Sequence, residues 1–238
     1  MEIEETKSKL EENKAVKTTI EKQKQNKLSS DNAAEFFLSY GQEHQEELVE
    51  IQTDFGLIKI KLFKDTPIHR ANFLYLISQK YFNSTFFHRV SKDHVIQAGN
   101  SDSEETAKKR AELGDYKLPQ EINDQHFHKR GAVAAARNYK KNETKASNPY
   151  EFYISLGKSY SKHQLKLMAE SYNTEFNETQ LEIYSSIGGS PHLDFEHTIF
   201  GEVVEGMDIV EKISEVEVDS GEWPLVNIPI KLNIVDSL

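Results

Sequence analysis

The segment FFHRVSKDHVIQAGN, residues 86–100, decides how this chain is interpreted, because it places an arginine and a glutamine in runs that otherwise predict buried β-strands. Val, Ile and Phe fill most of it, and residues 91–93 predict a turn between two strands. On the two-residue period of a strand, Phe87 and Arg89 share one face. A buried guanidinium is costly to desolvate, so Arg89 is either a structural ion pair or a donor held ready at a concave site.

Two further motifs follow this segment in the same chain. GAVAAAR and PYEFYIS occupy residues 131–137 and 149–155, and HLDFEHTIFGEVVEGMDIVEKI occupies residues 192–213. Together with FHRV and VIQAGN, these motifs resemble the signature of the cyclophilins, which are peptidyl-prolyl cis/trans isomerases. The resemblance covers about Val49 to Leu238, with insertions, and is closest to bacterial members that carry a helical insert before the HLD motif.

The pattern of elements predicts the fold class. Many short strands, two framing helices and no alternation of strand with helix are typical of a mostly β fold, here a closed antiparallel barrel capped by two helices. One predicted strand closes it, with apolar residues at every second position: Ile228, Ile230, Leu232 and Ile234. The resemblance implies a cyclophilin-like barrel of eight strands.

Outside the barrel we expect a helical N-terminal extension and a helical insert. Residues 1–30 are rich in Lys, Glu, Gln and Asn and predict a charged extension, either helical or disordered, which could bind a partner. A partner-binding coiled coil is the more specific alternative, but the apolar residues of this segment do not follow a continuous heptad repeat. Residues 31–47 predict a docking helix with Asp31 as N-cap. The resemblance implies a cyclophilin-like domain over residues 48–238.

Four further helix starts stand out in residues 66–189. Thr66 and Pro67 predict an N-cap followed by proline at the first helical position. Residues 103–113 predict a helix where the family usually has a glycine-rich loop. The insert, residues 158–189, contains two capping boxes, Ser161 with Gln164 and Asn177 with Gln180. We expect both insert helices to pack on the barrel through apolar stripes: Leu165, Met168 and Tyr172, then Leu181 and Tyr184.

Site residues follow from the resemblance, motif by motif. The catalytic arginine of the family falls on Arg89, its peptide-anchoring glutamine on Gln97 and its small backbone-contact residue on Ala136. The floor of the proline pocket falls on Tyr153, with Leu193 and His197 as its wall. Five positions depart from the family pattern and predict a more polar pocket: His94, Val95, Arg137, Glu151 and His192. The implied substrate-binding set also includes His88 and Phe152.

Prolyl isomerisation needs neither a nucleophile nor a cofactor. The prolyl amide resists rotation because the nitrogen lone pair is delocalised into the carbonyl. We expect Arg89 to donate to the prolyl nitrogen when the amide is twisted, and so to assist protein folding at Xaa-Pro bonds. The alternatives are a weakly active or inactive peptide-binding scaffold, and an unrelated β-barrel module in which Arg89 is only a structural ion pair.

His94 stands where an aromatic residue usually lines the pocket. With its ordinary pKa near 6.5, it would become charged close to Arg89 as the pH falls. We therefore expect activity to fall below about pH 6.5.

Composition limits the partners and cofactors. A net charge of −10, with 29 Lys+Arg against 39 Asp+Glu, argues against nucleic acid, so the implied partners are proline-containing peptides and unfolded proteins. With 0 cysteines there is no Cys-based zinc site. His126 and His128 would share a face of an extended segment, but we expect surface histidines there, and no metal or cofactor in the chain.

The chain shows no apolar run long enough to span a membrane, and acidic residues follow Met1. As written, it is expected to be a cytoplasmic monomer. A periplasmic location would follow if an export signal had been removed.

Overall fold

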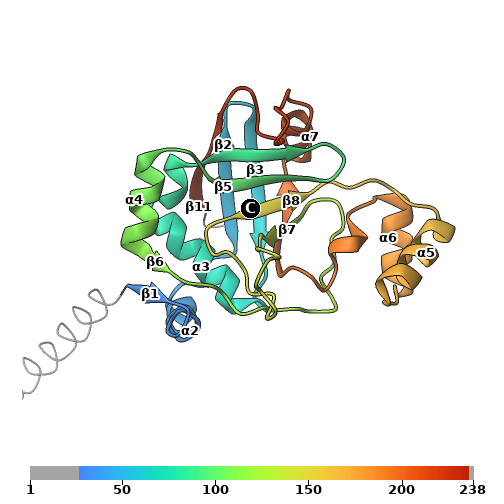
Figure 1. The fold of residues 1–238 in the computed structure, drawn as a ribbon, viewed down its shortest axis with the longest axis horizontal. Coiled ribbons are helices and arrows are strands. Elements are labelled where there is room, and N and C mark those ends of the chain that lie inside the picture. The colour runs from blue at the N-terminus through green and yellow to red at the C-terminus, as the bar shows by residue number, and fades with distance from the viewer. Residues whose placement is uncertain (1–26, 236–238) are drawn as a thin grey trace, which may run out of the picture.

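Nine strands form one antiparallel sheet that curls into a nearly closed barrel in the computed structural model, which describes residues 27–235 (Figure 1). The order of strands around the barrel is β10-β4-β5-β8-β7-β9-β3-β2-β11. The mostly β class predicted from the sequence is therefore confirmed. The strands are β2 (Leu48–Thr53), β3 (Gly56–Leu62), β4 (Phe86–Ser91), β5 (Val95–Asn100), β7 (Ala132–Ala135), β8 (Phe152–Ser155), β9 (Ile199–Glu205), β10 (Ile228–Pro229) and β11 (Lys231–Val235).

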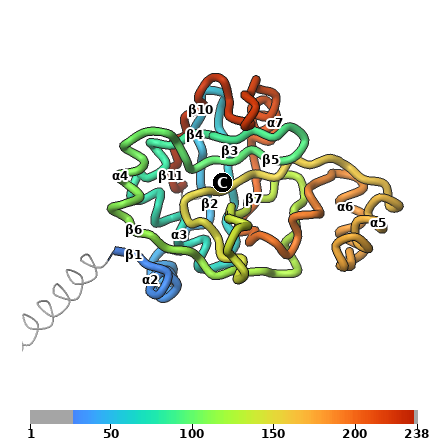
Figure 2. Tube along the Cα trace, in the orientation of Figure 1, coloured from blue at the N-terminus to red at the C-terminus, as the bar shows by residue number. Residues whose placement is uncertain are grey.

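The strand count differs from the predicted eight because the last strand is interrupted. The predicted closing strand is split at Ile230, whose backbone N–H donates to the carbonyl of Thr85 instead of continuing a ladder. Before the break β10 pairs with β4, and after it β11 pairs with β2. The two outer strands of the sheet are thus consecutive in the chain, and they follow one another at the seam of the barrel (Figure 2).

Six α-helices accompany the barrel within the described residues. The predicted fold, a barrel capped by two helices with further helices in the extension and the insert, therefore differs in the details of its helices. None of them is long and apolar enough to cross a membrane. Two 3₁₀ turns, η1 (Tyr81–Ser84) and η2 (Pro191–Leu193), lie between the strands. The helices are α2 (Ala33–Glu43), α3 (Pro67–Ser78), α4 (Glu104–Leu113), α5 (Lys162–Tyr172), α6 (Glu178–Ser186) and α7 (Met207–Ser214).

Helix α3 starts at Pro67 as predicted, but its first N–H groups are satisfied from a distant part of the chain. Thr66 occupies the N-cap position, and its hydroxyl makes no cap bond with the helix. The carboxylate of Glu121 accepts from the backbone N–H groups of Ile68 and His69, at 3.0 and 2.9 Å. A carboxylate at a helix N-terminus also has favourable electrostatics, so the cap is tertiary rather than local.

Helix α2 docks on α3 through aromatic side chains. Its N-cap is Asn32 rather than the predicted Asp31, and the Asn32 side chain accepts from Ser29 instead of capping the helix. Phe37 is fully buried and packs edge-on against Tyr75, with ring centroids 5.8 Å apart. This segment therefore contributes directly to the core.

A short parallel ladder joins the chain before α2 to the end of α4. Strand β1 (Leu28–Ser29) pairs with β6 (Gly114–Asp115). Gly114 has φ of +133°, and a Cβ there would lie 2.1 Å from the carbonyl oxygen of Leu28, so only glycine permits this approach. The predictions made for residues 1–26, including the coiled coil, lie outside the described residues.

The insert forms the two predicted helices, and both predicted capping boxes are present at their starts. Leu165 and Tyr184 are both fully buried. Tyr184 contacts Phe127 and Asp194 outside the insert, whereas Leu165 lines a hollow within the insert. Tyr172 is 55% exposed, so the prediction that it packs on the barrel is wrong. The insert projects from one side of the barrel, away from α4 (Figure 1). A hollow of about 730 Å³ lies within it, lined only by residues of the insert.

The buried apolar residues form two clusters because successive side chains of a strand face opposite ways. The main core fills the barrel and includes Phe152 and Ile154 of β8. A second, smaller cluster lies on the other face of the same strands. Its members are Val95, Ala132, Ala134, Ala136, Tyr153, Leu193 and Ile199.

Candidate functional site

A β-bulge directs Arg89 out of the barrel. Phe87 lies opposite Ala98 and Arg89 lies opposite Gln97, so β4 has one extra residue, His88, between these two pairs. Phe87 is consequently buried in the main core, whereas the Arg89 side chain is 36% exposed. The expectation that Phe87 and Arg89 share a face is therefore wrong. A bulge of this kind re-aims the following side chain, which frees Arg89 for contacts outside the core.

Glu222 is the anionic partner of Arg89. Its Oε2 accepts from Arg89 Nε at 2.8 Å and lies 2.7 Å from Arg89 Nη2, while its Oε1 accepts from the Ser91 hydroxyl at 2.6 Å. The backbone carbonyl of Glu222 also accepts from Val90 N–H at 2.8 Å. The Ser91 hydrogen bond, and next the positive charge of Arg89, outweigh burial and lower the Glu222 pKa. Sequence reasoning missed Glu222 because it lies 133 residues from Arg89.

The backbone of Glu222 supports this arrangement. Glu222 has φ of +64°, a left-handed conformation that is uncommon for a residue with a Cβ. Its own N–H donates to the carbonyl of Asp219 at 3.1 Å. The Asp219 side chain in turn accepts from Gly221 and Trp223. This turn holds Glu222 in a conformation that aims its carboxylate at Arg89.

Gln97 and Glu151 form a second polar cluster beside Arg89. Gln97 Nε2 donates to Glu151 Oε2 at 3.0 Å, and Arg110 Nη2 lies 3.3 Å from Glu151 Oε1. His88 Nε2 is 3.6 Å from the same carboxylate. Burial raises the Glu151 pKa, but His88, Arg110 and Gln97 outweigh it and the pKa is lowered. Gln97 is thus held by Glu151 in this structure.

Arg110 of α4 supplies the cation for the buried Glu151 carboxylate, with its Nη2 3.3 Å from Glu151 Oε1. Arg110 is fixed by the Tyr81 hydroxyl and the Gly99 carbonyl, at 2.7 and 2.9 Å. A paired buried charge costs far less than an isolated one, so Arg110 makes the burial of the Glu151 carboxylate tolerable.

The second hydrophobic cluster brings four of the predicted pocket residues together. Val95, Ala136, Tyr153 and Leu193 all belong to it. Phe152 does not, because it lies on the opposite face of β8 and packs on Phe73 in the main core. We therefore remove Phe152 from the predicted substrate-binding set.

A buried chain of polar contacts lies behind Tyr153. The Tyr153 hydroxyl donates to His128 Nε2 at 2.8 Å, and His128 Nδ1 donates to Asp194 Oδ1 at 2.9 Å. Asp194 Oδ2 accepts from the Tyr184 hydroxyl of α6 at 2.6 Å. His128 is fully buried, so the expectation of a surface histidine is wrong. These contacts join the floor of the predicted pocket to the insert.

His126 does not pair with His128. Its ring stacks on Phe63, with centroids 3.9 Å apart, and its Nε2 is 2.8 Å from Asp65 Oδ1. Within residues 27–235, no group of three or more His, Cys, Asp and Glu is placed to hold a metal ion. The two histidines thus have different partners, Asp65 for His126 and Asp194 with Tyr153 for His128.

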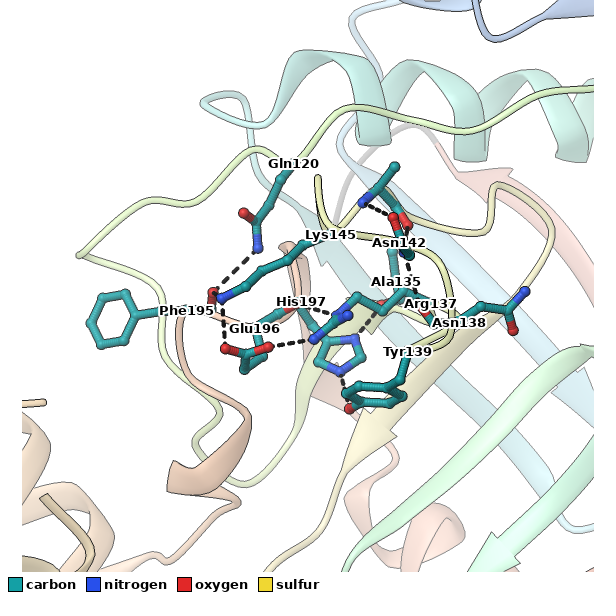
Figure 3. Close-up of polar contacts among 11 residues, drawn as sticks. Gln120, Ala135, Arg137, Asn138, Tyr139, Asn142, Lys145, Phe195, Glu196 and His197 are labelled. Atoms are coloured by element: carbon teal, nitrogen blue, oxygen red, sulfur yellow. Dashed lines mark hydrogen bonds and ion pairs between the residues drawn. The ribbon is translucent and has the colours of Figure 1, made fainter. Parts of the chain in front are cut away.

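Arg137 and His197 belong to a third cluster, at the start of the loop after β7 (Figure 3). His197 Nδ1 donates to the Ala135 carbonyl at 3.1 Å, and its Nε2 accepts from the Tyr139 hydroxyl at 2.7 Å. Burial is the main reason that the His197 pKa falls to about 4. His197 is thus neutral at pH 7, and the 64% exposed Tyr139 is held against it.

The Arg137 side chain is engaged within the protein. Arg137 Nε donates to the Glu196 carbonyl at 2.8 Å, and its Nη2 pairs with the Glu196 carboxylate. Lys145 Nζ is 2.6 Å from the same carboxylate (Figure 3). The Tyr139 ring lies over the guanidinium, 4.2 Å from its carbon. Arg137 is therefore only 5% exposed, and a substrate would meet Tyr139 before it met Arg137.

His94 and His192 face one another across 98 residues of sequence, with their Nε2 atoms 3.1 Å apart. Burial, then His192 and Arg89, lower the His94 pKa to about 4. Burial, then His128, also lower the His192 pKa. The expected loss of activity below about pH 6.5 is therefore not supported for His94, since the ring stays neutral until about pH 4.

Comparison with known proteins identifies the family. The family model described as "Cyclophilin type peptidyl-prolyl cis-trans isomerase/CLD" matches residues 48–234. A putative peptidyl-prolyl cis-trans isomerase of Staphylococcus saprophyticus is 28% identical over 181 residues, covering 76% of this chain and 87% of that protein. Peptidyl-prolyl cis-trans isomerase-like 3 of Gallus gallus is 28% identical over 186 residues, covering 77% of this chain and 92% of that protein.

A solved structure supports the fold. The cyclophilin-type peptidyl-prolyl cis-trans isomerase of Cryptosporidium parvum aligns with a TM-score of 0.59 at 22% identity, over 81% of this chain and 99% of that one. The same protein was also solved in the presence of the dipeptide Ala-Pro, with a TM-score of 0.57 at 23% identity, over 80% of this chain and 100% of that one.

Proposed function

The chain belongs to the cyclophilin-type peptidyl-prolyl cis-trans isomerase family, and from this premise we propose that Arg89 is the catalytic donor for rotation about Xaa-Pro bonds. The substrates are proline-containing peptides and unfolded proteins. Residues 48–238 form the isomerase domain, and residues 158–189 are its insert. The single observation that supports the proposal is the bulge at His88, after which Arg89 lies opposite Gln97, and Gln97 lies opposite Tyr153 of the second hydrophobic cluster.

The reaction needs a donor more than a base. Rotation about a prolyl amide costs about 18 to 20 kcal/mol because the nitrogen lone pair is shared with the carbonyl. Twisting the amide localises that lone pair on nitrogen, where it can accept a hydrogen bond. A donor aimed at this nitrogen therefore stabilises the twisted state more than the planar one, which is what lowers a barrier.

Arg89 retains donors for this task despite its ion pair. A guanidinium carries five N–H groups, and Glu222 engages one at Nε and one at Nη2. Three N–H groups remain, two of them on Nη1. Glu222 thus orients the guanidinium and leaves its other edge for the substrate. The structural ion pair and the catalytic donor, which the sequence leaves as alternatives, are compatible in one side chain.

The second hydrophobic cluster offers a surface for the proline ring. Tyr153, the floor that the resemblance implies, and Leu193, one of the two implied wall residues, both belong to it, together with Ala136, the implied backbone-contact residue. The Tyr153 hydroxyl donates to the buried His128, so the polar end of the side chain points away from the pocket. The apolar ring of Tyr153 is left to contact the proline. The presence of Ala-Pro with the C. parvum protein is consistent with a small prolyl ligand for this fold.

Turnover of an Ala-Pro peptide in a protease-coupled assay tests the proposal. We expect wild-type chain to accelerate prolyl exchange and Arg89→Ala to lower kcat/KM by tenfold or more, a loss of at least about 1.4 kcal/mol of transition-state stabilisation. Arg130→Ala is the matched control, because it removes an arginine from another surface ion pair, that with Glu211. Unchanged turnover in folded Arg89→Ala would remove Arg89 from the mechanism, and an inactive wild type would favour a peptide-binding scaffold.

A further inference from the structure

His94 and His192 are brought together at one edge of the predicted pocket by two firmly held backbone segments. The carbonyl of His94 accepts from the backbone N–H groups of Leu156 and Gly157, at 2.8 and 3.2 Å. His192 lies in the η2 turn between Pro191, whose ring restricts its backbone, and Leu193, whose N–H donates to Ser190. Both side chains are half-buried, so their separation is set by the fold rather than by free rotation.

The two imidazoles have no other side-chain hydrogen bonds within residues 27–235. Their Nε2 atoms are 3.1 Å apart and their ring centroids 5.0 Å apart. In the metal-free chain one Nε2–H donates to the other Nε2. A cation of the right size can replace that single proton between the two nitrogens, once the donor ring moves its hydrogen to Nδ1.

We propose that His94 and His192 bind one divalent transition-metal ion such as Zn²⁺, Ni²⁺ or Cu²⁺, and that this ion competes with peptide for the pocket. Zinc lies 2.0 to 2.1 Å from an imidazole nitrogen, so an ion bound by both Nε2 atoms at 3.1 Å would have an N–metal–N angle of about 100°. This angle lies between the square-planar and tetrahedral values, about 90° and about 109°. A shift of a few tenths of an ångström satisfies either geometry.

The donor set decides the class of ion. Two imidazoles suit Zn²⁺, Cu²⁺ and Ni²⁺, whereas Mg²⁺ and Ca²⁺ prefer oxygen ligands. The site has only two protein ligands, so water or a substrate group completes it.

The electrostatics around the pair are mixed. The positive charge of Arg89 repels a positive charge at His94, whereas the negative charge of Glu222 attracts it. Asp194 acts favourably on a positive charge at His192. At each ring the unfavourable neighbour, Arg89 at His94 and His128 at His192, has a larger effect than the carboxylate.

The location links the metal to the pocket. His94 precedes Val95 and His192 precedes Leu193, and both of these neighbours belong to the second hydrophobic cluster. An ion held at the pair would stand beside the surface proposed for the proline ring. The competition part of the inference rests on the proposed function, whereas the metal site itself does not.

Calorimetric titration of chelator-treated, untagged chain with ZnCl₂ tests the site without substrate. We expect one Zn²⁺ per chain, no binding of Mg²⁺, and at least tenfold weaker Zn²⁺ binding in both His94→Phe and His192→Phe. His163→Ala, an exposed histidine on α5, and His126→Ala, whose ring lies beside Asp65, are the matched controls and should bind as wild type. Unchanged binding in either Phe variant, or equal loss in His126→Ala, would overturn the site.

Two further measurements separate the parts of the inference. Electron paramagnetic resonance of bound Cu²⁺ should show two coupled nitrogens in wild type and one in each Phe variant, and a wild-type signal in a folded Phe variant would again overturn the site. Zn²⁺ should also weaken binding of an Ala-Pro peptide to wild type but not to His192→Phe. If Zn²⁺ binds without affecting the peptide, the competition is wrong. If the wild-type chain had no isomerase activity, the proposed function would be wrong, but the Zn²⁺ titration would still test the metal site.

Discussion

Glu222 shows how a single residue prepares the candidate catalytic group. Its carboxylate accepts from Arg89 and Ser91, and its left-handed backbone is held by the turn around Asp219. A partly exposed ion pair contributes only about 0.2 to 1 kcal/mol, so its main effect is on the direction of the guanidinium rather than on stability.

Replacing Glu222 tests whether this orientation matters. We expect Glu222→Gln to lower kcat/KM by at most about fivefold and to change the free energy of unfolding by less than about 1 kcal/mol, because only a partly exposed pair is lost. Steady-state kinetics and urea denaturation measure the two effects. Glu215→Gln is the control, since it breaks the exposed pair with Lys92. A faster Glu222→Gln enzyme would mean that Glu222 restrains Arg89 instead of orienting it.

At the scale of elements, α2 illustrates how a segment outside the family domain becomes part of the core. Its Phe37 is fully buried, whereas the adjacent Leu38 is 46% exposed. The 3.6-residue period of the helix separates these neighbours onto different faces. The helix therefore packs as a fixed part of the barrel surface.

A matched pair of substitutions in α2 measures this packing. We expect Phe37→Ala to lower the free energy of unfolding by about 3 to 5 kcal/mol, because it leaves a cavity in a closed core. Leu38→Ala shortens an apolar side chain at the neighbouring exposed position and should cost less than about 0.5 kcal/mol. Chemical denaturation compares the two. Similar costs for both variants would show that α2 is not docked as described.

At the scale of the whole molecule, the histidines around the pocket make stability depend on pH. His94 and His197 have pKa values lowered to about 4, and the His192 pKa is also lowered. In the unfolded chain each titrates near 6.5. Between about pH 4 and about pH 6.5 the unfolded state binds more protons, so stability falls as the pH falls through this window. Below it, the paired carboxylates with lowered pKa values add to the loss: Glu151, Glu196 and Glu222.

Urea denaturation at pH 7, 6, 5 and 4.5 checks this dependence. We expect the midpoint to decrease steadily from pH 7 to 4.5, and the slope to be smaller in His94→Phe, which replaces a titrating ring with one that is always neutral. A midpoint that is constant between pH 7 and 5 would contradict the lowered pKa values.

Much of the local structure could be predicted from neighbouring residues. The capping boxes at Ser161 and Asn177, the proline start of α3 and the helix of residues 104–113 are all present. Each depends on hydrogen bonds or backbone preferences within a few residues, which the local sequence contains. The family followed from three ordered motifs for the same reason, since each is a short contiguous string.

The sequence by itself therefore determined the mostly β class and the family. Only the tertiary structure decided which face Arg89 takes, because the bulge at His88 depends on pairing with β5. It also decided the partners of the site residues: Glu222 for Arg89, Arg110 for Glu151 and His192 for His94. These contacts join residues 133, 41 and 98 positions apart, and such pairs form only when the barrel closes and stacks distant segments side by side.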